Sequence, residues 1–145
     1  MIDIEIKVDD SDERKLRKLL QRAKKGLLVG IKKAILYAEG EAKKNFNKSG
    51  KPKVRTGTLR RSIKSGVSNN TAWIGSDVVY ARIIEKGGVI TAKNKPYLSF
   101  QIDGKWFKKK SVTIPPRPYL QPAISEHMDT ISRIIAQEIV EEMEK

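Results

Sequence analysis

Few side chains in this sequence could perform catalysis or bind a metal. The chain has no cysteine and a single histidine, His127, which the helical pattern around it places on a polar face. Nucleophilic catalysis and zinc binding both need clustered side chains of defined types. We therefore interpret His127 as a surface residue. Among the carboxylates Glu85 is distinctive because it stands just before the pair Gly87-Gly88. We predict that the protein is not an enzyme and that it uses no cofactor, metal or small-molecule substrate.

Basic side chains offer a second kind of chemistry. Thirty Lys and Arg against seventeen Asp and Glu give a net charge of +13, which favours association with polyanions. Lysine and arginine neutralise phosphates, and an exposed tryptophan can stack on a base. A solubilising surface explains the same residues. The candidate contacts with nucleic acid or another polyanion are Arg60, Arg61, Lys64, Trp106, Lys108, Lys109 and Lys110.

The charge is unevenly distributed along the chain. Residues 125–145 contain six acidic and two basic residues, a balance of −4, so the rest of the chain carries +17. A basic body with an acidic C-terminal helix can pair with copies of itself, although solvated helix faces account for the same counts.

The elements that must position these residues begin with a predicted strand. At residues 2–8, isoleucine and valine alternate with charged residues, which is the period of a half-buried strand. A helix follows, because apolar residues recur every three or four positions from Leu16 to Phe46, and Asp10 or Ser11 can cap its start.

The predicted first helix is long for a chain of this size. If continuous it would span about 50 Å at 1.5 Å per residue. Gly26, Gly30 and Gly40 each weaken it, so we predict a bend or break near them. The apolar stripe is interpreted as core packing, with the alternative that part of it packs on a neighbouring subunit.

Two hairpins are predicted in the middle of the chain. One turns at Asn69-Asn70, and the other turns at Asp103-Gly104, a strong two-residue turn signal. In the first, Ile63, Val67, Ala72 and Ile74 share one face and Trp73 lies on the other. In the second, the apolar face contains Leu98, Phe100, Ile102 and Phe107, and the basic face contains Trp106, Lys108 and Lys110.

A proline-rich segment leads into the last predicted helix. Residues 114–124, "IPPRPYLQPAI", hold four of the six prolines. Proline fixes φ and favours extended geometry in the residue before it, so we predict a rigid extended strap from Ile114 to Pro118. Pro122 fits the first turn of a C-terminal helix, whose apolar positions run from Leu120 to Ile139. A stiff connector and a bracket that positions this helix against a partner both fit the pattern.

Two shorter helical segments precede the strap. Thr56 can cap a turn in which Leu59 and Ile63 share one face. A short helix from Tyr80 ends at Gly87-Gly88, where glycine can form the C-cap.

Three sequence blocks now stand in order: "RTGTLRRSI", "YARIIEKG" and "IPPRPYLQPAI". This order, flanked by two long helices, resembles the tail-component family of lambda-like siphophages, also described as tail-completion or neck proteins. The resemblance covers nearly the whole chain. Lys86, where many relatives have an aromatic residue, and the longer stretch 89–112 depart from the family pattern. The matching positions are Thr56, Gly57, Leu59, Ser62, Ile63, Tyr80, Ala81, Glu85, Gly87, Arg117, Pro118, Tyr119, Leu120, Pro122 and Ala123.

The resemblance implies a structural virion protein of a tailed phage or prophage, acting in head-tail joining or tail completion through subunit contacts. Its partners would be other phage neck or tail proteins and copies of itself in a homo-oligomeric ring. It would be assembled in the bacterial host cytoplasm and located in the neck or tail of the virion. The strap would be anchored by Arg117 and Tyr119. The implied assembly contacts are Thr56, Gly57, Leu59, Tyr80, Glu85, Gly87, Arg117, Pro118 and Tyr119.

We therefore expect one α+β domain over residues 1–145, with an antiparallel sheet of about four to five strands packed by a long N-terminal helix and a C-terminal helix. No apolar stretch reaches the roughly 18 residues of a membrane span, and no signal peptide is expected. The alternative function is a small basic protein that binds nucleic acid without sequence specificity. A third interpretation, a phage-encoded hydrolase, would depend on Glu85.

Overall fold

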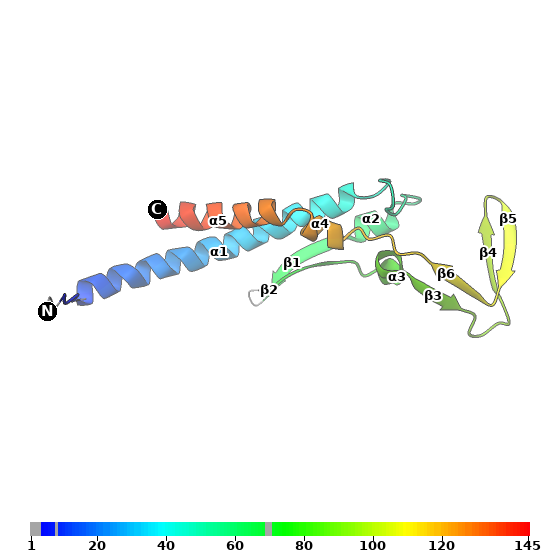
Figure 1. Ribbon diagram of the computed structural model, residues 1–145, viewed down its shortest axis with the longest axis horizontal. Helices are drawn as coiled ribbons and strands as arrows, with labels where there is room; N and C mark the ends of the chain where they lie inside the picture. Colours follow the sequence, from blue (N-terminus) through cyan, green and yellow to red (C-terminus); the bar gives the residue numbers. More distant parts are fainter. Residues whose placement is uncertain (1–3, 8, 69–70) are drawn as a thin grey trace.

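Two helices packed along each other form the spine of the molecule in the computed structural model, which describes residues 4–7, 9–68 and 71–145 (Figure 1). They are α1 (Asp10–Lys44) and α5 (Met128–Glu144). The first is one continuous helix of 35 residues, so the predicted break is wrong. Its cap is Asp9, one residue before the predicted position, whose carboxylate accepts the Asp12 N–H at 2.8 Å.

The packing of two glycines of α1 explains why the helix continues where a break was predicted. Gly26 and Gly30 are buried against α5. A Cβ on Gly26 would lie 2.6 Å from the Ile139 Cα, and a Cβ on Gly30 would lie 2.8 Å from the Ile135 Cα. These two glycines therefore allow the helix backbones to approach closely, and that packing offsets the roughly 1 kcal/mol that each glycine costs relative to alanine in a helix.

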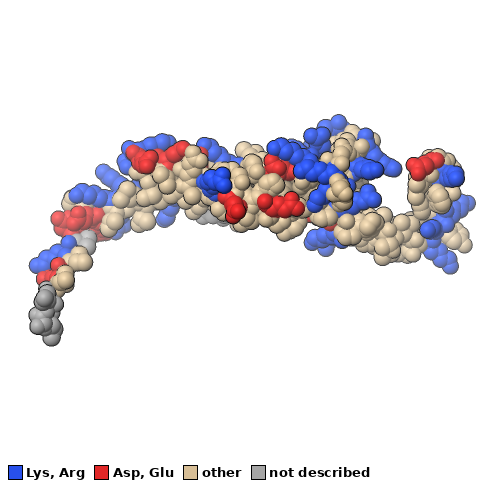
Figure 2. Space-filling view, turned by 45° about the horizontal axis from the view of Figure 1, so that its top comes forward, with Lys and Arg blue, Asp and Glu red and all other residues tan. Residues whose placement is uncertain are grey.

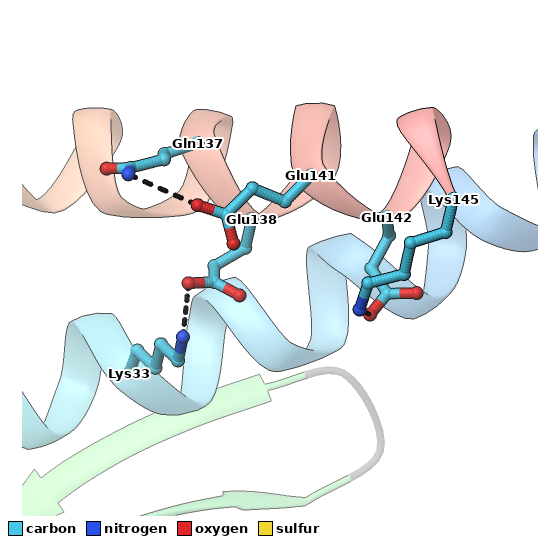
Figure 3. A network of polar contacts seen from close by, with 6 residues as sticks. All are labelled: Lys33, Gln137, Glu138, Glu141, Glu142 and Lys145. Carbon is cyan, nitrogen blue, oxygen red and sulfur yellow. Dashed lines mark hydrogen bonds and ion pairs between the residues drawn. The ribbon is translucent and has the colours of Figure 1, made fainter.

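Ion pairs flank this helix contact. Glu138 of α5 pairs with Lys33 of α1 (Figure 3). Glu142 lies 3.2 Å from the Lys25 ammonium and 2.6 Å from that of Lys145. Part of the acidic charge of the C-terminal helix is therefore neutralised within the same chain.

The described strands form three separate antiparallel pairs. β1 (Lys64–Ser68) pairs with β2 (Thr71–Gly75) against α1. β3 (Gly88–Thr91) pairs with β6 (Ser111–Ile114), and β4 (Leu98–Ile102) pairs with β5 (Lys105–Lys109). The α+β class is confirmed, but the strands do not join into one sheet. The reason is that β3–β6 leads away from the helices and carries β4–β5 at the far end of the molecule (Figure 1).

The predicted N-terminal strand is not formed in the described residues 4–7, where the Ile4 and Ile6 side chains are 85% and 86% exposed. Ile2, Asp3 and Val8 lie outside the described residues.

Both predicted hairpins are present. In the first, Val67 lies opposite Ala72, and the predicted turn at Asn69-Asn70 lies outside the described residues. In the second, Asp103 and Gly104 both have positive φ, at 48° and 79°, as a tight hairpin turn requires. Phe100 and Phe107 are paired across the strands, with ring centroids 5.9 Å apart. We name residues 88–114 the arm.

A small core lies where the C-terminal end of α1 meets α2 (Thr58–Ser62), α3 (Ala81–Lys86) and α4 (Gln121–Ser125). Tyr119 and Ile63 are its largest fully buried side chains. The members of the core are Ala42, Phe46, Leu59, Ile63, Ala81, Tyr119 and Ala123. Within the described ranges, no helix combines the length and apolarity needed to span a bilayer.

The predicted C-terminal helix is divided into α4 and α5 by a break at residues 126–127. This break turns His127 toward α1, where its Nε2 lies 3.1 Å from a Glu41 carboxylate oxygen and its ring contacts Tyr37 edge-on. The side chain is only 22% exposed. The prediction of a surface histidine is therefore wrong, because uninterrupted helical periodicity assigned the residue to the wrong face.

Candidate assembly site

The three sequence blocks meet around one pocket of about 440 Å³. The first block contributes Thr56, Gly57 and Leu59, the second contributes Tyr80, and the strap contributes Arg117. These are five of the nine predicted assembly contacts. Cations rim the pocket, namely Lys53, Arg55, Arg60 and Arg117. The pocket therefore joins an apolar wall to a positively charged edge.

Glu85 fixes the strap at the point where it enters α4. Its Oε2 accepts the N–H groups of Tyr119 and Leu120 at 2.8 and 3.0 Å, and its Oε1 accepts that of Gln121 at 2.9 Å. A carboxylate bonded to several N–H groups at a helix start is favourable because those groups have no partner within the helix. Both oxygens are thus occupied by the backbone, so the carboxylate serves to position the strap.

The strap also lies tightly against the end of α3. The Arg117 N–H donates to the Ile84 carbonyl at 2.8 Å. Gly87 has φ of 67°, and a Cβ there would lie 2.7 Å from the Pro116 nitrogen and 2.8 Å from the Ile114 carbonyl oxygen. Both the backbone conformation and the lack of space require glycine at this position.

Tyr119 anchors the strap in the core. Its side chain is completely buried, with its ring centroid 5.1 Å from that of Phe46. Its carbonyl accepts a hydrogen bond from the buried Asn45 side chain at 3.0 Å. The hydroxyl has no hydrogen-bond partner among the described residues. Burial, with a contribution from the Glu85 charge, raises the pKa of Tyr119 to about 12. The strap is therefore held by two contacts, the Tyr119 ring packed in the core and the Glu85 carboxylate bonded to the backbone.

We expect Tyr119→Phe to leave stability at neutral pH unchanged or to raise it by up to about 1 kcal/mol, because it removes a buried unpaired hydroxyl. At high pH the difference should grow. An unfolded tyrosine loses its proton near pH 10 and Tyr119 in the folded chain near pH 12, so ionisation favours unfolding as the pH rises through this range. Urea unfolding of both proteins at pH 7 and pH 11 tests this. Equal losses in the two proteins would contradict it.

The predicted polyanion contacts fall into two separate groups. Arg60 and Arg61 of α2 lie beside the pocket, and Lys64 begins β1, 3.9 Å from an Asp77 carboxylate oxygen. The other group lies on the arm, where Figure 2 shows Lys and Arg side chains at the tip of the molecule, away from those around α2. The sequence alone did not indicate this separation.

The lysines of the arm are divided between its two faces. Trp106, 72% exposed, and Lys108 share one face of β5. Lys109 lies opposite Leu98 on the face that holds Phe100. Trp106 and Lys108 therefore lie on one face as predicted, while Lys109 lies on the other, because adjacent residues of a strand point to opposite faces.

Sequence analysis missed the residues that order the loop before the first block. Asn47 adopts φ of 67°, its N–H donates to the Pro52 carbonyl at 2.8 Å, and its side-chain oxygen accepts the Val54 N–H at 2.8 Å. These bonds hold Lys53 and Arg55 at the pocket edge. An asparagine near Gly and Pro is the available signal, since asparagine tolerates positive φ.

No cluster of three His, Asp or Glu side chains able to hold a metal ion is found in residues 4–7, 9–68 and 71–145.

The fold and the site define an α+β protein in which Glu85 and Tyr119 hold the proline-rich strap beside the pocket. The sequence model of the phage virion morphogenesis family matches residues 37–144, a stretch that contains all three blocks, and the chain belongs to this family. It is therefore a structural component of phage virions. No curated protein and no solved structure is significantly similar to it.

Proposed function

We propose that the protein acts at the junction of phage head and tail, in head-tail joining or tail completion, through contacts with copies of itself and with other neck or tail proteins. The family supports a virion role. The observation that carries the finer assignment is the convergence of the three blocks on one pocket beside a strap pinned by Glu85.

Rigidity at this place suits a subunit of a closed ring. In a symmetric assembly every copy repeats the same contact, so an angular error at one interface recurs at all the others. The strap is constrained by prolines, by three bonds to Glu85 and by the buried Tyr119 ring. Such a strap presents Arg117 and the pocket edge at a fixed angle to a neighbouring subunit.

Deletion of the gene from the phage tests the proposal. We expect separate heads and tails in electron micrographs and a loss of plaques, both restored by the wild-type gene. Normal infectious particles without the gene would refute the role.

The pocket itself is tested by charge reversal in the same phage. Arg117→Glu should lower the plaque titre by roughly tenfold or more, because reversing a charge at a contact both removes an attraction and adds a repulsion. The exposed helical cation Lys24, reversed in Lys24→Glu, is the matched control and should change the titre little. Equal titres for the two variants would show that the pocket edge is not a contact.

Contact with DNA is a second role, which the arm favours. The arm carries six lysines against one aspartate, and Trp106 is available for stacking. Binding of the purified protein to duplex DNA, measured over a range of salt concentrations, tests it. Tight binding at physiological salt that weakens steeply as salt rises would favour this role.

A further inference from the structure

The N-terminal segment has the pattern of a strand but no strand to pair with. Ile4 and Ile6 alternate with Glu5 and Lys7, so the two isoleucines would share one face of an extended chain. Both are almost fully exposed, although large aliphatic side chains are usually buried. An alternating segment of this kind is suited to completing a sheet edge that has an apolar groove beside it.

Such a groove lies along β2. It has a volume of about 360 Å³, and its nine lining residues are all apolar and come from α1, β2, α4 and α5. Ile31 and Ile35 lie on the α1 side, Ala72 on the β2 side and Ile135 on the α5 side. A second hollow continues it past Ile74. The groove therefore follows the inward-facing side chains of β2.

The edge of β2 is free to accept another strand. Within the described part of the chain, β2 pairs with β1 alone, so its other edge has unpaired backbone N–H and C=O groups. The two hollows are lined by residues of β2, Ala72 and Ile74, and by none of β1. The free edge and the apolar groove thus lie on the same side of the strand pair.

The segment cannot reach the groove of its own chain. Ile4 is six residues before Asp10, which allows a reach of at most about 20 Å. Ile31, the nearest groove residue on α1, is 21 residues after Asp10, or about 32 Å along the helix. Figure 1 shows that α1 begins at the end of the molecule away from the core, which its C-terminal end meets. If this segment supplies a strand to such a groove, the groove must therefore belong to another molecule.

We propose that the segment containing Ile4 and Ile6 forms a third strand on β2 of a second copy, with both isoleucines in the groove. The long α1 then acts as the spacer between the donated strand and the groove of its own chain. Donor and acceptor are different surfaces, so the contact is head-to-tail and repeats into a ring or a filament. The proposal rests on the proposed function, because a ring of subunits requires self-association and this contact would supply it.

Cysteine cross-linking tests the pairing, and the absence of cysteine from the chain makes each introduced thiol unique. Chains with Ile4→Cys or Ile6→Cys are mixed with differently tagged chains carrying Ala72→Cys or Ile74→Cys and then oxidised gently. We expect a disulfide-linked heterodimer from at least one pair. The matched control is Glu5→Cys, which lies on the other face of the same segment. Equal yields from Glu5→Cys, or no heterodimer from any isoleucine position, would overturn the proposal.

Sedimentation of the full chain provides a second measurement. Ile4→Asn with Ile6→Asn should weaken self-association by roughly tenfold or more, whereas Glu5→Asn with Lys7→Asn should leave it nearly unchanged. A wild-type chain that stays monomeric at about 100 μM would overturn the proposal. Both measurements use purified protein without phage. If they fail while gene deletion still separates heads from tails, this contact is wrong and the proposed function stands.

Discussion

Glu85→Ala is expected to lower the free energy of unfolding by about 3–5 kcal/mol, a large change for one partly buried side chain. The substitution leaves three backbone N–H groups, those of Tyr119, Leu120 and Gln121, without their acceptor. The strap and the start of α4 then lose the contact that orients them. Urea unfolding followed by circular dichroism measures the effect.

Two further variants separate the causes. Glu85→Gln keeps the shape and one acceptor oxygen but removes the charge, so we expect a smaller loss of about 1–2 kcal/mol. Glu126→Ala removes an exposed carboxylate just after α4 and should change stability by less than about 0.5 kcal/mol. A Glu85→Ala protein as stable as Glu126→Ala would show that the strap is held by its prolines and by Tyr119 alone.

Gly26→Ala combined with Gly30→Ala is expected to destabilise the protein by about 2–5 kcal/mol, despite the better helix propensity of alanine. Each added methyl group would meet backbone atoms of α5 at 2.6–2.8 Å, namely those of Ile139 and Ile135. Backbone cannot rotate away as a side chain can, so α5 must shift along its length and lose packing. Thermal and urea unfolding report the loss.

Gly40→Ala is the matched control, because Gly40 lies in the same helix and a Cβ there would meet nothing within 4 Å. This variant should raise stability by about 0.5–1 kcal/mol. The sign of the effect thus differs among glycines of one helix. A stabilised Gly26→Ala, Gly30→Ala protein would mean that the helices do not approach as closely as the structure has them.

Local patterns in the sequence predicted most of the elements. Periodicity of the apolar residues predicted the long first helix. The Asp103-Gly104 pair predicted a hairpin, which the strand register confirms. These succeeded because turn geometry and helical amphipathicity depend on residues close in sequence. The prediction of an N-terminal strand was wrong because a strand depends on a partner that can be distant in the sequence. Its pattern is local, but a strand needs a partner, and α1 places Ile4 and Ile6 beyond the reach of their own sheet.

The candidate site was only partly predictable. Glu85 was singled out for its place before two glycines, but its role depends on backbone N–H groups more than thirty residues later in the chain. The pocket forms where the loop held by Asn47 lies against the strap. The spacing of residues in the sequence does not predict this contact. Long-range contacts of this kind arise from packing and not from local propensity.

By itself the sequence determined the basic charge, most of the elements and the three blocks that lead to the virion family. The tertiary structure alone decided that those blocks surround one pocket, that the strands form separate pairs and that Gly26 and Gly30 serve helix contact. The physical reason is clearest at the glycines. A missing side chain weakens a helix and also makes room for a neighbour, and only the position of α5 determines which effect prevails.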